Sequence, residues 1–539
     1  MIDTFVIDSL PEKADQPEFL PLDNGEELNF QFSNATEYFL DRWCLEHEED
    51  IALRSLTENH SYKKVLDRVS QYAQVLVDDF GLTPGNRVLL RGRNSPKAAM
   101  LHLAVLRAGG VVVSTIPLLR SGELKKIVKK ARVSHCICEV DFIDEIADVQ
   151  AQLTWFKILG SFSNDNDKSV SFYDVDDLAD KKETSFAPFD RGLDWPALIA
   201  FTSGTTGEPK GTIHTHGDLL AICETFAKKT LRPNKSDIFC GTPPLAFTYG
   251  LGGLLLFPLS VGASALLLES CKPMDLLKAI DQLKPTVCFN SPTAYRMILS
   301  NLNAFDISSL RKCVSAGEHL SKATFDAFEK RTGVKLIDGI GSTEMLHLFI
   351  ASAGDDICPG ATGKIVDGYE ATILDEFGNE LPNGQVGWLA VKGPTGCRYL
   401  SDDRQQSYVI NGWNVTGDAY KKDDDGYFWY QSRMDDLIIS GGHNIAAPEV
   451  ENALLSHQVI SECAVVGVPD KLRGSIVKAY VVLENGNIPS GELEVELQNH
   501  VKKLIAPYKY PRSIAFVEEL PKTLTGKLKR YELRDREAA

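Results

Sequence analysis

The sequence has no excess of positive charge. Lysine and arginine together number 57 and aspartate and glutamate 74, which gives a formal net charge of −17 at pH 7. A chain with this balance repels phosphate backbones and anionic lipid headgroups, so we expect no nucleic-acid partner and no broad membrane binding. A polyanionic ligand would need a small, local basic pocket.

The eleven cysteines lack the spacing of a zinc site or of a disulfide framework, and Cys136 and Cys138 lie too close together for a zinc pair. The first residues lack the basic and apolar segments of a secretory signal. Glycine, proline and serine interrupt the apolar stretch 251–268, which predicts a buried helix, turn and strand rather than a membrane span. We therefore expect a cytoplasmic protein in a reducing compartment, without stable membrane insertion.

Strand and helix patterns alternate through the first two thirds of the chain. Residues 87–90 predict a strand, Asn94 or Ser95 can cap a helix that Pro96 opens, and residues 111–114 predict the returning strand. Further apolar runs that predict strands fall at 197–201, 265–268, 287–290 and 335–337. The predicted fold class is α/β, with a large N-terminal body of parallel-rich sheets sandwiched by helices.

The pattern changes after residue 365 to short strands and tight turns, which predict a small β-subdomain. Beyond it, a helix opened by Pro448, strands at 462–468 and 477–483 and a helix that ends before Pro507 predict a small α+β domain. A chain of 539 residues is long enough for two such cores. We therefore predict domains 1–434 and 435–539.

One loop between two predicted strands is rich in glycine and hydroxyl side chains. It runs Thr202-Ser-Gly-Thr-Thr-Gly-Glu-Pro-Lys-Gly211. Glycines let backbone N–H groups converge on oxygen atoms, hydroxyls add donors, and Lys210 supplies a compact positive charge. The alternative is a flexible surface turn. No lysine and hydroxyl pair follows Gly207, as a P-loop NTPase requires, and the segment 339–341 lacks the third glycine of a Rossmann fingerprint. The loop predicts a phosphate site outside those two classes.

Four further blocks follow the loop in the chain, at 338–344, 416–418, 432–445 and 521–527. Together with the loop they resemble the adenylate-forming superfamily of acyl-CoA synthetases, adenylation domains and luciferases, from about residue 30 to the end. The resemblance implies an acid–thiol ligase that joins a carboxylic acid to AMP and passes the acyl group to coenzyme A. It also implies ATP, Mg²⁺ and coenzyme A as cofactors, and a mobile C-terminal domain.

The resemblance gives individual residues roles in the first step. Thr343 would hydrogen-bond the α-phosphate, Glu344 would help to hold Mg²⁺, and Lys527 would contact the substrate carboxylate. The implied ATP and AMP contacts are Thr202, Ser203, Gly204, Thr205, Thr206, Gly207, Lys210, Gly317, Glu318, Asp338, Gly339, Asp418 and Arg433. Alternative explanations are a helix cap for the pair 343–344 and a plain surface position for Lys527.

The second step would use other positions. Asp435 matches the family's hinge residue, about which the small domain would turn to withdraw Lys527. Gly441 and Gly442 would line the passage for the pantetheine arm of coenzyme A, because a residue without Cβ leaves room there. The thiol of coenzyme A is itself the nucleophile, so no cysteine or histidine is given a chemical role.

Aromatic residues beside glycines make up the candidate acyl pocket. Phe247, Tyr249, Gly250 and His347 favour a flat slot for a planar ring, with a phenolic donor on Tyr249 and with His347 meeting a polar substituent or the carboxylate. The alternative is that they are core aromatics. The segments 338–347 and 393–399 resemble the benzoate and 2-aminobenzoate CoA ligase branch, so we expect a small aromatic acid as substrate.

Three other functions stay open at this point. The acceptor could be a carrier protein instead of coenzyme A, or the acid could be non-aromatic, because pocket side chains change specificity while motifs remain. The third is an acyl-adenylate-binding protein without turnover. The presence of Lys210, Glu344, Asp418 and Lys527 argues against the third.

Overall fold

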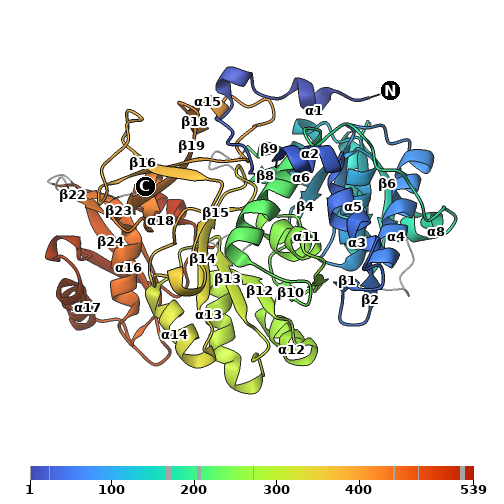
Figure 1. Ribbon diagram of the computed structural model, residues 1–539. Helices are drawn as coiled ribbons and strands as arrows, with labels where there is room; N and C mark the ends of the chain where they lie inside the picture. Colours follow the sequence, from blue (N-terminus) through green and yellow to red (C-terminus); the bar gives the residue numbers. More distant parts are fainter. Residues whose placement is uncertain are drawn as a thin grey trace.

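The computed structural model describes residues 2–23, 25–153, 155–164, 172–202, 208–270, 272–436, 438–440, 443–470, 473–522 and 528–538. Figure 1 shows a sheet of early strands at one end of the molecule, a second sheet in the middle, and the C-terminal strands and helices at the opposite end. The described segments thus form a body and a smaller terminal part, which agrees with the predicted fold class.

The first large sheet is parallel except at one edge, and its strand order is β7-β6-β5-β3-β4-β8-β9. Its strands are β3 (Arg87–Arg91), β4 (Val111–Thr115), β5 (His135–Glu139), β6 (Lys157–Phe162), β7 (Tyr173–Asp174), β8 (Pro196–Thr202) and the antiparallel β9 (Lys210–Thr215). Between β3 and β4 lies α5 (Pro96–Arg107), whose first turn is capped by Ser95 Oγ accepting from the Ala98 N–H at 3.1 Å. The predicted strand, cap and helix are confirmed here.

The second large sheet has the order β15-β14-β13-β12-β10-β11-β1-β2. Its strands are β1 (Ile51–Arg54), β2 (Asn59–Ser61), β10 (Ile238–Gly241), β11 (Ser264–Leu266), β12 (Val287–Asn290), β13 (Lys312–Ala316), β14 (Leu336–Gly341) and β15 (Leu348–Ala351). β14 runs four residues past the predicted end at Ile337, because it pairs with β13 on one side and with the antiparallel β15 on the other. Asp338 and Gly339 therefore lie within a strand.

Helices fill the layer between the two sheets and cover their outer faces. The inner layer contains α4 (Tyr62–Gln74), α5 and α9 (His216–Ile222). The outer helices are α6 (Ser121–Lys130) and α7 (Ile143–Gln152) on the first sheet, and α12 (Pro273–Leu283), α13 (Pro292–Asn301) and α14 (Lys322–Thr332) on the second. Val88 faces the inner layer and Leu89 the outer one, as strand alternation requires of a sheet that is covered on both faces.

The remaining helical segments of the described chain are short. The α-helical ones are α1 (Phe5–Asp8), α2 (Gly25–Gln31), α3 (Arg42–Cys44), α8 (Val175–Ala179), α10 (Thr248–Leu251), α11 (Phe257–Ser260) and α15 (Gln405–Tyr408). The π-helical segments are η2 (Glu37–Asp41), η3 (Val75–Asp79), η5 (Cys223–Leu231) and η6 (Gly252–Leu256), and the 3₁₀ turns are η1 (Lys13–Asp15), η4 (Val140–Phe142), η7 (Leu302–Ala304), η8 (Gly354–Asp356), η9 (Met434–Asp436) and η10 (Pro507–Lys509). No helix within the described ranges is both long and apolar enough to cross a bilayer.

The β-subdomain and the C-terminal part each have a sheet of their own. The subdomain is antiparallel and consists of β16 (Glu370–Leu374), β17 (Val386–Lys392), β18 (Val409–Ile410), β19 (Trp413–Lys422) and β20 (Phe428–Arg433). The C-terminal sheet consists of β21 (Ile438–Ser440), β22 (His443–Ile445), β23 (Ile460–Asp470), β24 (Gly474–Leu483) and β25 (Ser513–Phe516). Its faces are covered by α16 (Ala447–Leu455) with α17 (Gly491–Leu504), and by α18 (Arg530–Ala538).

Candidate functional site

The glycine-rich loop connects β8 to β9, the last two strands at one edge of the first sheet. Thr202 ends β8, Lys210 begins β9, and the two residues pair across the antiparallel ladder. Ser203, Gly204, Thr205, Thr206 and Gly207 lie outside the described residues. On the far side of the loop, Glu208 forms an ion pair with Lys126 of α6 at 2.8 Å. Both side chains are exposed, so this is a surface ion pair between helix α6 and the first described residue after the gap.

Tyr399 links Lys210 to Glu344. The Tyr399 hydroxyl donates to Glu344 Oε1 at 2.5 Å, and Lys210 Nζ lies 3.5 Å from the same hydroxyl. Burial and the charge of Glu344 raise the pKa of Tyr399 well above its usual range, so the phenol keeps its proton and remains a donor. The predicted phosphate-loop lysine and the predicted Mg²⁺ ligand are thus brought to one place, through a residue that sequence reasoning did not select.

Asp418 and Arg433 pair across β19 and β20. They are register partners, and Arg433 Nη1 donates to Asp418 Oδ1 at 3.0 Å. Burial raises the pKa of Asp418, whereas the Arg433 guanidinium opposes that rise. The charge of Glu344 also acts on Asp418, which places this pair near the cluster of Lys210, Tyr399 and Glu344. The two residues predicted at one ribose site therefore lie side by side.

Asp338 lies in β14 beside Ser315 of β13, its register partner. Asp338 Oδ1 and Ser315 Oγ are shielded from solvent and have no hydrogen-bond partner among the described residues. Burial raises the pKa of Asp338 well above its usual range. Two buried polar atoms without partners are costly in a folded protein, and a ligand with its own donors would satisfy them. Such a pair fits the predicted adenine site.

The remaining adenine-site candidates lie in or beside the same strands. A Cβ on Gly339 would come within 3.0 Å of Leu348 Cδ1, so this position is tightly packed. Gly317 has a φ of +86°, a conformation that favours glycine. The Glu318 carboxylate accepts from the N–H and hydroxyl of Thr293, at 3.2 and 2.6 Å, and so caps the start of α13. Any nucleotide contact of Glu318 would have to compete with that cap.

Aromatic rings surround His347 in the acyl region. Its ring centroid lies 5.5 Å from that of Tyr249 and 4.5 Å from that of Phe257, and the side chain is buried. Burial lowers the pKa of His347 to about 3, so the imidazole is neutral. Nε2 donates to the Tyr249 carbonyl at 3.3 Å, and Nδ1 has no partner among the described residues.

Two expectations for the acyl slot change in the structure. The Tyr249 hydroxyl already donates to the carbonyl oxygens of Asn290 and Val314, at 3.2 and 3.1 Å, so it is not available to a substrate. The space beside Gly252 is filled by a core ring, because a Cβ on this residue would come within 2.4 Å of the His347 ring. Phe247, which precedes α10, is partly exposed, and Gly250 is buried against the Pro244 carbonyl.

The predicted residues of the mobile domain are only partly described. Lys527, Gly441 and Gly442 lie outside the described residues. The backbone of Asp435 lies in the 3₁₀ turn η9, between the β-subdomain and the C-terminal sheet. The predicted hinge position thus falls at the junction of the two parts, and its role stays a prediction.

A buried pair of side chains, His214 and Asp218, lies next to Thr343 and was not predicted from the sequence. His214 Nε2 donates to the Thr343 carbonyl at 2.8 Å, and His214 Nδ1 faces Asp218 Oδ2 at 3.3 Å. The separation of 129 residues between His214 and Thr343 left no local signal. By contrast, His216 accepts from the Ala35 N–H at 3.1 Å and is a core histidine, as expected.

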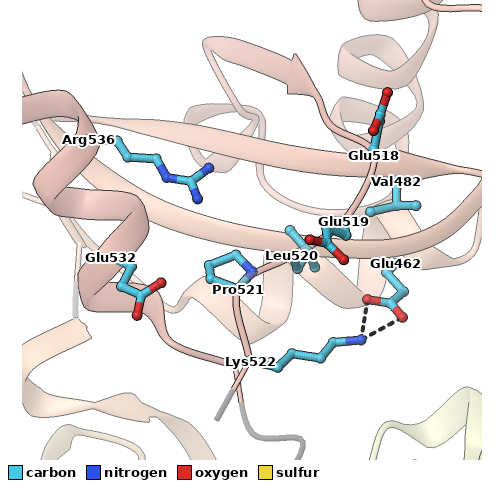
Figure 2. A pocket seen from close by; sticks show the side chains of 9 residues that line it. All are labelled: Glu462, Val482, Glu518, Glu519, Leu520, Pro521, Lys522, Glu532 and Arg536. Atoms are coloured by element: carbon cyan, nitrogen blue, oxygen red, sulfur yellow. Dashed lines mark hydrogen bonds and ion pairs between the residues drawn. The ribbon is translucent and has the colours of Figure 1, made fainter.

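A separate pocket of about 680 Å³ lies in the C-terminal part (Figure 2). Its lining comprises Glu462, Val482, Glu518, Glu519, Leu520, Pro521, Lys522, Glu532 and Arg536. Lys522 is paired with Glu462 at 2.8 Å, as the dashed lines in Figure 2 show. Four glutamates make this wall acidic, so it is a poor host for a polyphosphate.

Comparison with protein families identifies the chain. The model of the "AMP-binding enzyme" family matches residues 40–399, and that of the "AMP-binding enzyme C-terminal domain" matches residues 449–527. The chain belongs to the AMP-binding enzyme family. It is an acid–thiol ligase of the AMP-forming acyl-CoA synthetase type, a family whose substrates are ATP, a carboxylic acid and coenzyme A. The resemblance seen in the sequence motifs is confirmed.

Individual relatives of this ligase match over most of its length. It is 37% identical to the uncharacterized acyl–CoA ligase YtcI of Bacillus subtilis, over 89% of this chain and 91% of that one. It is 33% identical to benzoate–CoA ligase of Thauera aromatica, over 88% and 90%. The solved structure of the anthranilate CoA ligase AuaEII in complex with anthranoyl-AMP is 32% identical, with a TM-score of 0.88 and coverage of 94% and 97%.

Proposed function

We propose that this ligase adenylates a small aromatic carboxylic acid and transfers the aroyl group to coenzyme A. The best candidate is 2-aminobenzoate, followed by benzoate. The observation that carries the proposal is the ring cage of His347, Tyr249 and Phe257 beside the segment 247–250. Rings at these distances form a rigid apolar wall, and a flat substrate stacks on such a wall better than a flexible chain does.

The hydrogen bonds of His347 favour an amino-substituted ring. Because Nε2 donates to the Tyr249 carbonyl, Nδ1 is the acceptor atom of the neutral imidazole, and it has no partner among the described residues. We propose that the 2-amino group of the substrate donates to Nδ1, which benzoate cannot do. Relatives named for benzoate and anthranilate support the same class of acid.

The first half-reaction would take place between the phosphate loop and the turn 342–345. The acid carboxylate attacks the α-phosphorus of ATP, the bond to the leaving pyrophosphate breaks, and an acyl-adenylate forms. We propose that Lys210 and the loop hold the phosphates and that the Thr343 hydroxyl donates to the α-phosphate. Asp418 would accept from the ribose hydroxyls beside Arg433, and Asp338 would accept from the adenine amine.

The residues present also fit a magnesium ion that arrives with ATP. No cluster of three or more acidic, histidine or cysteine ligands exists within the described part of the chain. Magnesium in nucleotide sites takes one or two protein carboxylates and completes its shell with phosphates and water. Glu344 provides one such carboxylate, and Mg²⁺ held there would neutralise charge on the triphosphate.

The second half-reaction would use the C-terminal domain in another position. The thiolate of coenzyme A attacks the acyl carbon, and AMP leaves. We propose that Lys527 serves the first step only, that Asp435 is the hinge, and that Gly441 and Gly442 line the thiol passage.

Pyrophosphate release tests the proposal. The purified ligase is given ATP, Mg²⁺ and either 2-aminobenzoate, benzoate, butyrate or octanoate, with and without coenzyme A. We expect fastest release with 2-aminobenzoate and multiple turnovers only with coenzyme A. Preference for octanoate would contradict the ring cage as an aromatic site. Adenylate formation with no acceleration by coenzyme A would point to a carrier protein as acceptor.

A matched pair of variants tests the site itself. Glu344→Gln removes the carboxylate charge proposed to hold Mg²⁺, and we expect a loss of adenylation of about a hundredfold or more. The control is Glu376→Gln, an exposed glutamate in the hairpin between β16 and β17. Equal activity of both variants would remove Glu344 from the site.

A further inference from the structure

Every residue of the turn 342–345 is held by a side chain from elsewhere in the chain. The contacts are Ser342 Oγ with the Tyr408 hydroxyl at 3.4 Å, the Thr343 carbonyl with His214 at 2.8 Å, Glu344 with Tyr399 at 2.5 Å, and the Met345 carbonyl with Thr395 at 2.9 Å. Tyr399, Thr395 and Tyr408 come from one segment, residues 395–408, which follows β17 of the subdomain. The turn is therefore held in place by side chains of two other segments, β9 and residues 395–408.

The contact from His214 is itself fixed by a buried ion pair. Arg398 Nη1 donates to Asp218 Oδ2 at 2.7 Å, and the same oxygen faces His214 Nδ1. Although burial opposes ionisation, Arg398 and His214 lower the pKa of Asp218 to about 2. A buried carboxylate needs such partners, and they leave the imidazole one orientation. Both facing atoms are acceptors, so the two contacts together require a proton on each ring nitrogen, and Nε2 donates its proton to the Thr343 carbonyl.

Arg398 and Tyr399 are neighbours in the chain that support the turn in different ways, Arg398 through Asp218 and His214, and Tyr399 by direct contact with Glu344. The Ile213 N–H donates to the Arg398 carbonyl, and the Leu400 N–H donates to the Gly211 carbonyl, both at 2.8 Å. These bonds pair the segment with β9, so its successive side chains point to opposite faces. Arg398 therefore reaches the side of Asp218, and Tyr399 reaches Glu344.

We propose that His214 and Tyr399 are positioning residues for adenylation, which hold the Thr343 carbonyl and the Glu344 carboxylate where ATP and its magnesium ion arrive. This inference rests on the proposed roles of Thr343 and Glu344. Neither positioning residue contacts the reacting atoms. Because pyrophosphate and its metal are gone after the first step, the loss of either contact slows adenylation and spares thioester formation from bound acyl-adenylate.

Two substitutions at one position give the sharpest test. In His214→Gln the amide nitrogen replaces Nε2 at the same distance along the side chain, so the bond to the Thr343 carbonyl is kept. In His214→Asn the amide reaches only as far as Nδ1, and the bond is lost. Loss of a buried hydrogen bond of this kind predicts about a tenfold or larger rise in the KM for ATP, or a similar fall in adenylation rate, for His214→Asn alone. Tyr399→Phe removes a single hydroxyl and serves as an independent variant should changes at 214 disturb folding.

Both half-reactions are measured for each variant, with Glu344→Gln alongside. Adenylation is followed by pyrophosphate release, and thioester formation is measured from supplied aroyl-adenylate at saturation. We expect His214→Asn and Tyr399→Phe to lose adenylation, His214→Gln to retain it, and all three to form thioester normally. If Glu344→Gln loses adenylation while His214→Asn and Tyr399→Phe do not, the positioning role is wrong and the proposed function stands. Equal loss of activity in both half-reactions also overturns the inference. So does an equal loss of adenylation in His214→Gln and His214→Asn. Full activity of Glu344→Gln overturns the role of the turn itself.

Discussion

Alanine at Gly252 should weaken binding of the acid without affecting ATP. Gly252 has φ −61° and ψ −57°, which suit alanine, so the backbone conformation is not strained. The added Cβ would lie 2.4 Å from His347 Cδ2 and 2.8 Å from Nε2, whereas ordinary contacts are 3.4–4 Å. Either the ring or the helical segment η6 must move by about an ångström to relieve this overlap.

The expected size of the effect on the KM for the acid follows from how tightly the His347 ring is packed. The Phe257 centroid is 4.5 Å from that of His347, and Phe226 lies at 5.7 Å, so the cage blocks movement in those directions. Overpacking of a closed core costs about 1–3 kcal/mol, and 1.4 kcal/mol corresponds to a factor of ten. If the displaced ring enters the acyl site, the KM for the acid rises by about fivefold to 150-fold.

Steady-state pyrophosphate release with either substrate varied provides the assay. The control is Gly122→Ala, because the space around a Cβ at Gly122 is open. We expect that control to behave like the parent protein in both KM values. An unchanged KM for 2-aminobenzoate in folded Gly252→Ala, or an equal rise in the KM for ATP, would refute the location of the acyl site beside His347.

Three further predictions use other parts of the molecule. Lys527→Ala should slow adenylate formation far more than thioester formation from supplied adenylate, and equal losses would contradict domain alternation. Asp418→Asn should raise the KM for ATP by about tenfold and leave the KM for the acid unchanged; no change in the first would remove Asp418 from the ribose site. Acid should destabilise the fold as pH falls below about 6.5, the ordinary pKa of histidine, because burial lowers the pKa of His216 and of His347 to about 3 and only the unfolded chain binds those protons. Each of these histidines lowers the free energy of unfolding by about 1.4 kcal/mol between pH 7.5 and 5.5. In urea unfolding, His216→Asn should therefore lose about 1.4 kcal/mol less than the parent protein over this pH range. An equal loss in the two proteins would contradict the prediction.

The sequence predicted local elements well where one residue type determines the geometry. Ser95 and Pro96 begin α5 as their types require, and the change to tight turns after residue 365 corresponds to a separate sheet. The motif residues Glu344 and Asp418 were selected from the chain alone, and they lie close enough to interact electrostatically. Short-range patterns carry this kind of information because caps, turns and strand alternation act over a few residues.

Contacts between distant segments could not be predicted in this way. Tyr399 meets Glu344 across 55 residues, and periodicity does not specify which side chains meet. Aromatic residues beside glycines suggested a flat open slot, but the structure shows that the rings of His347 and Phe289 use the space beside Gly252 and Gly253. Tertiary packing decides whether a glycine leaves a cavity or admits a neighbour.

Direct competition between two acids is the most direct test of an aromatic acid–thiol ligase. Equal concentrations of 2-aminobenzoate and octanoate are given to the ligase with ATP, Mg²⁺ and coenzyme A, and both thioesters and the nucleotide products are quantified together. We predict 2-aminobenzoyl-CoA in large excess, with one AMP formed for each thioester. Octanoyl-CoA in excess would contradict the aromatic assignment, and ADP in place of AMP would contradict the adenylate route itself.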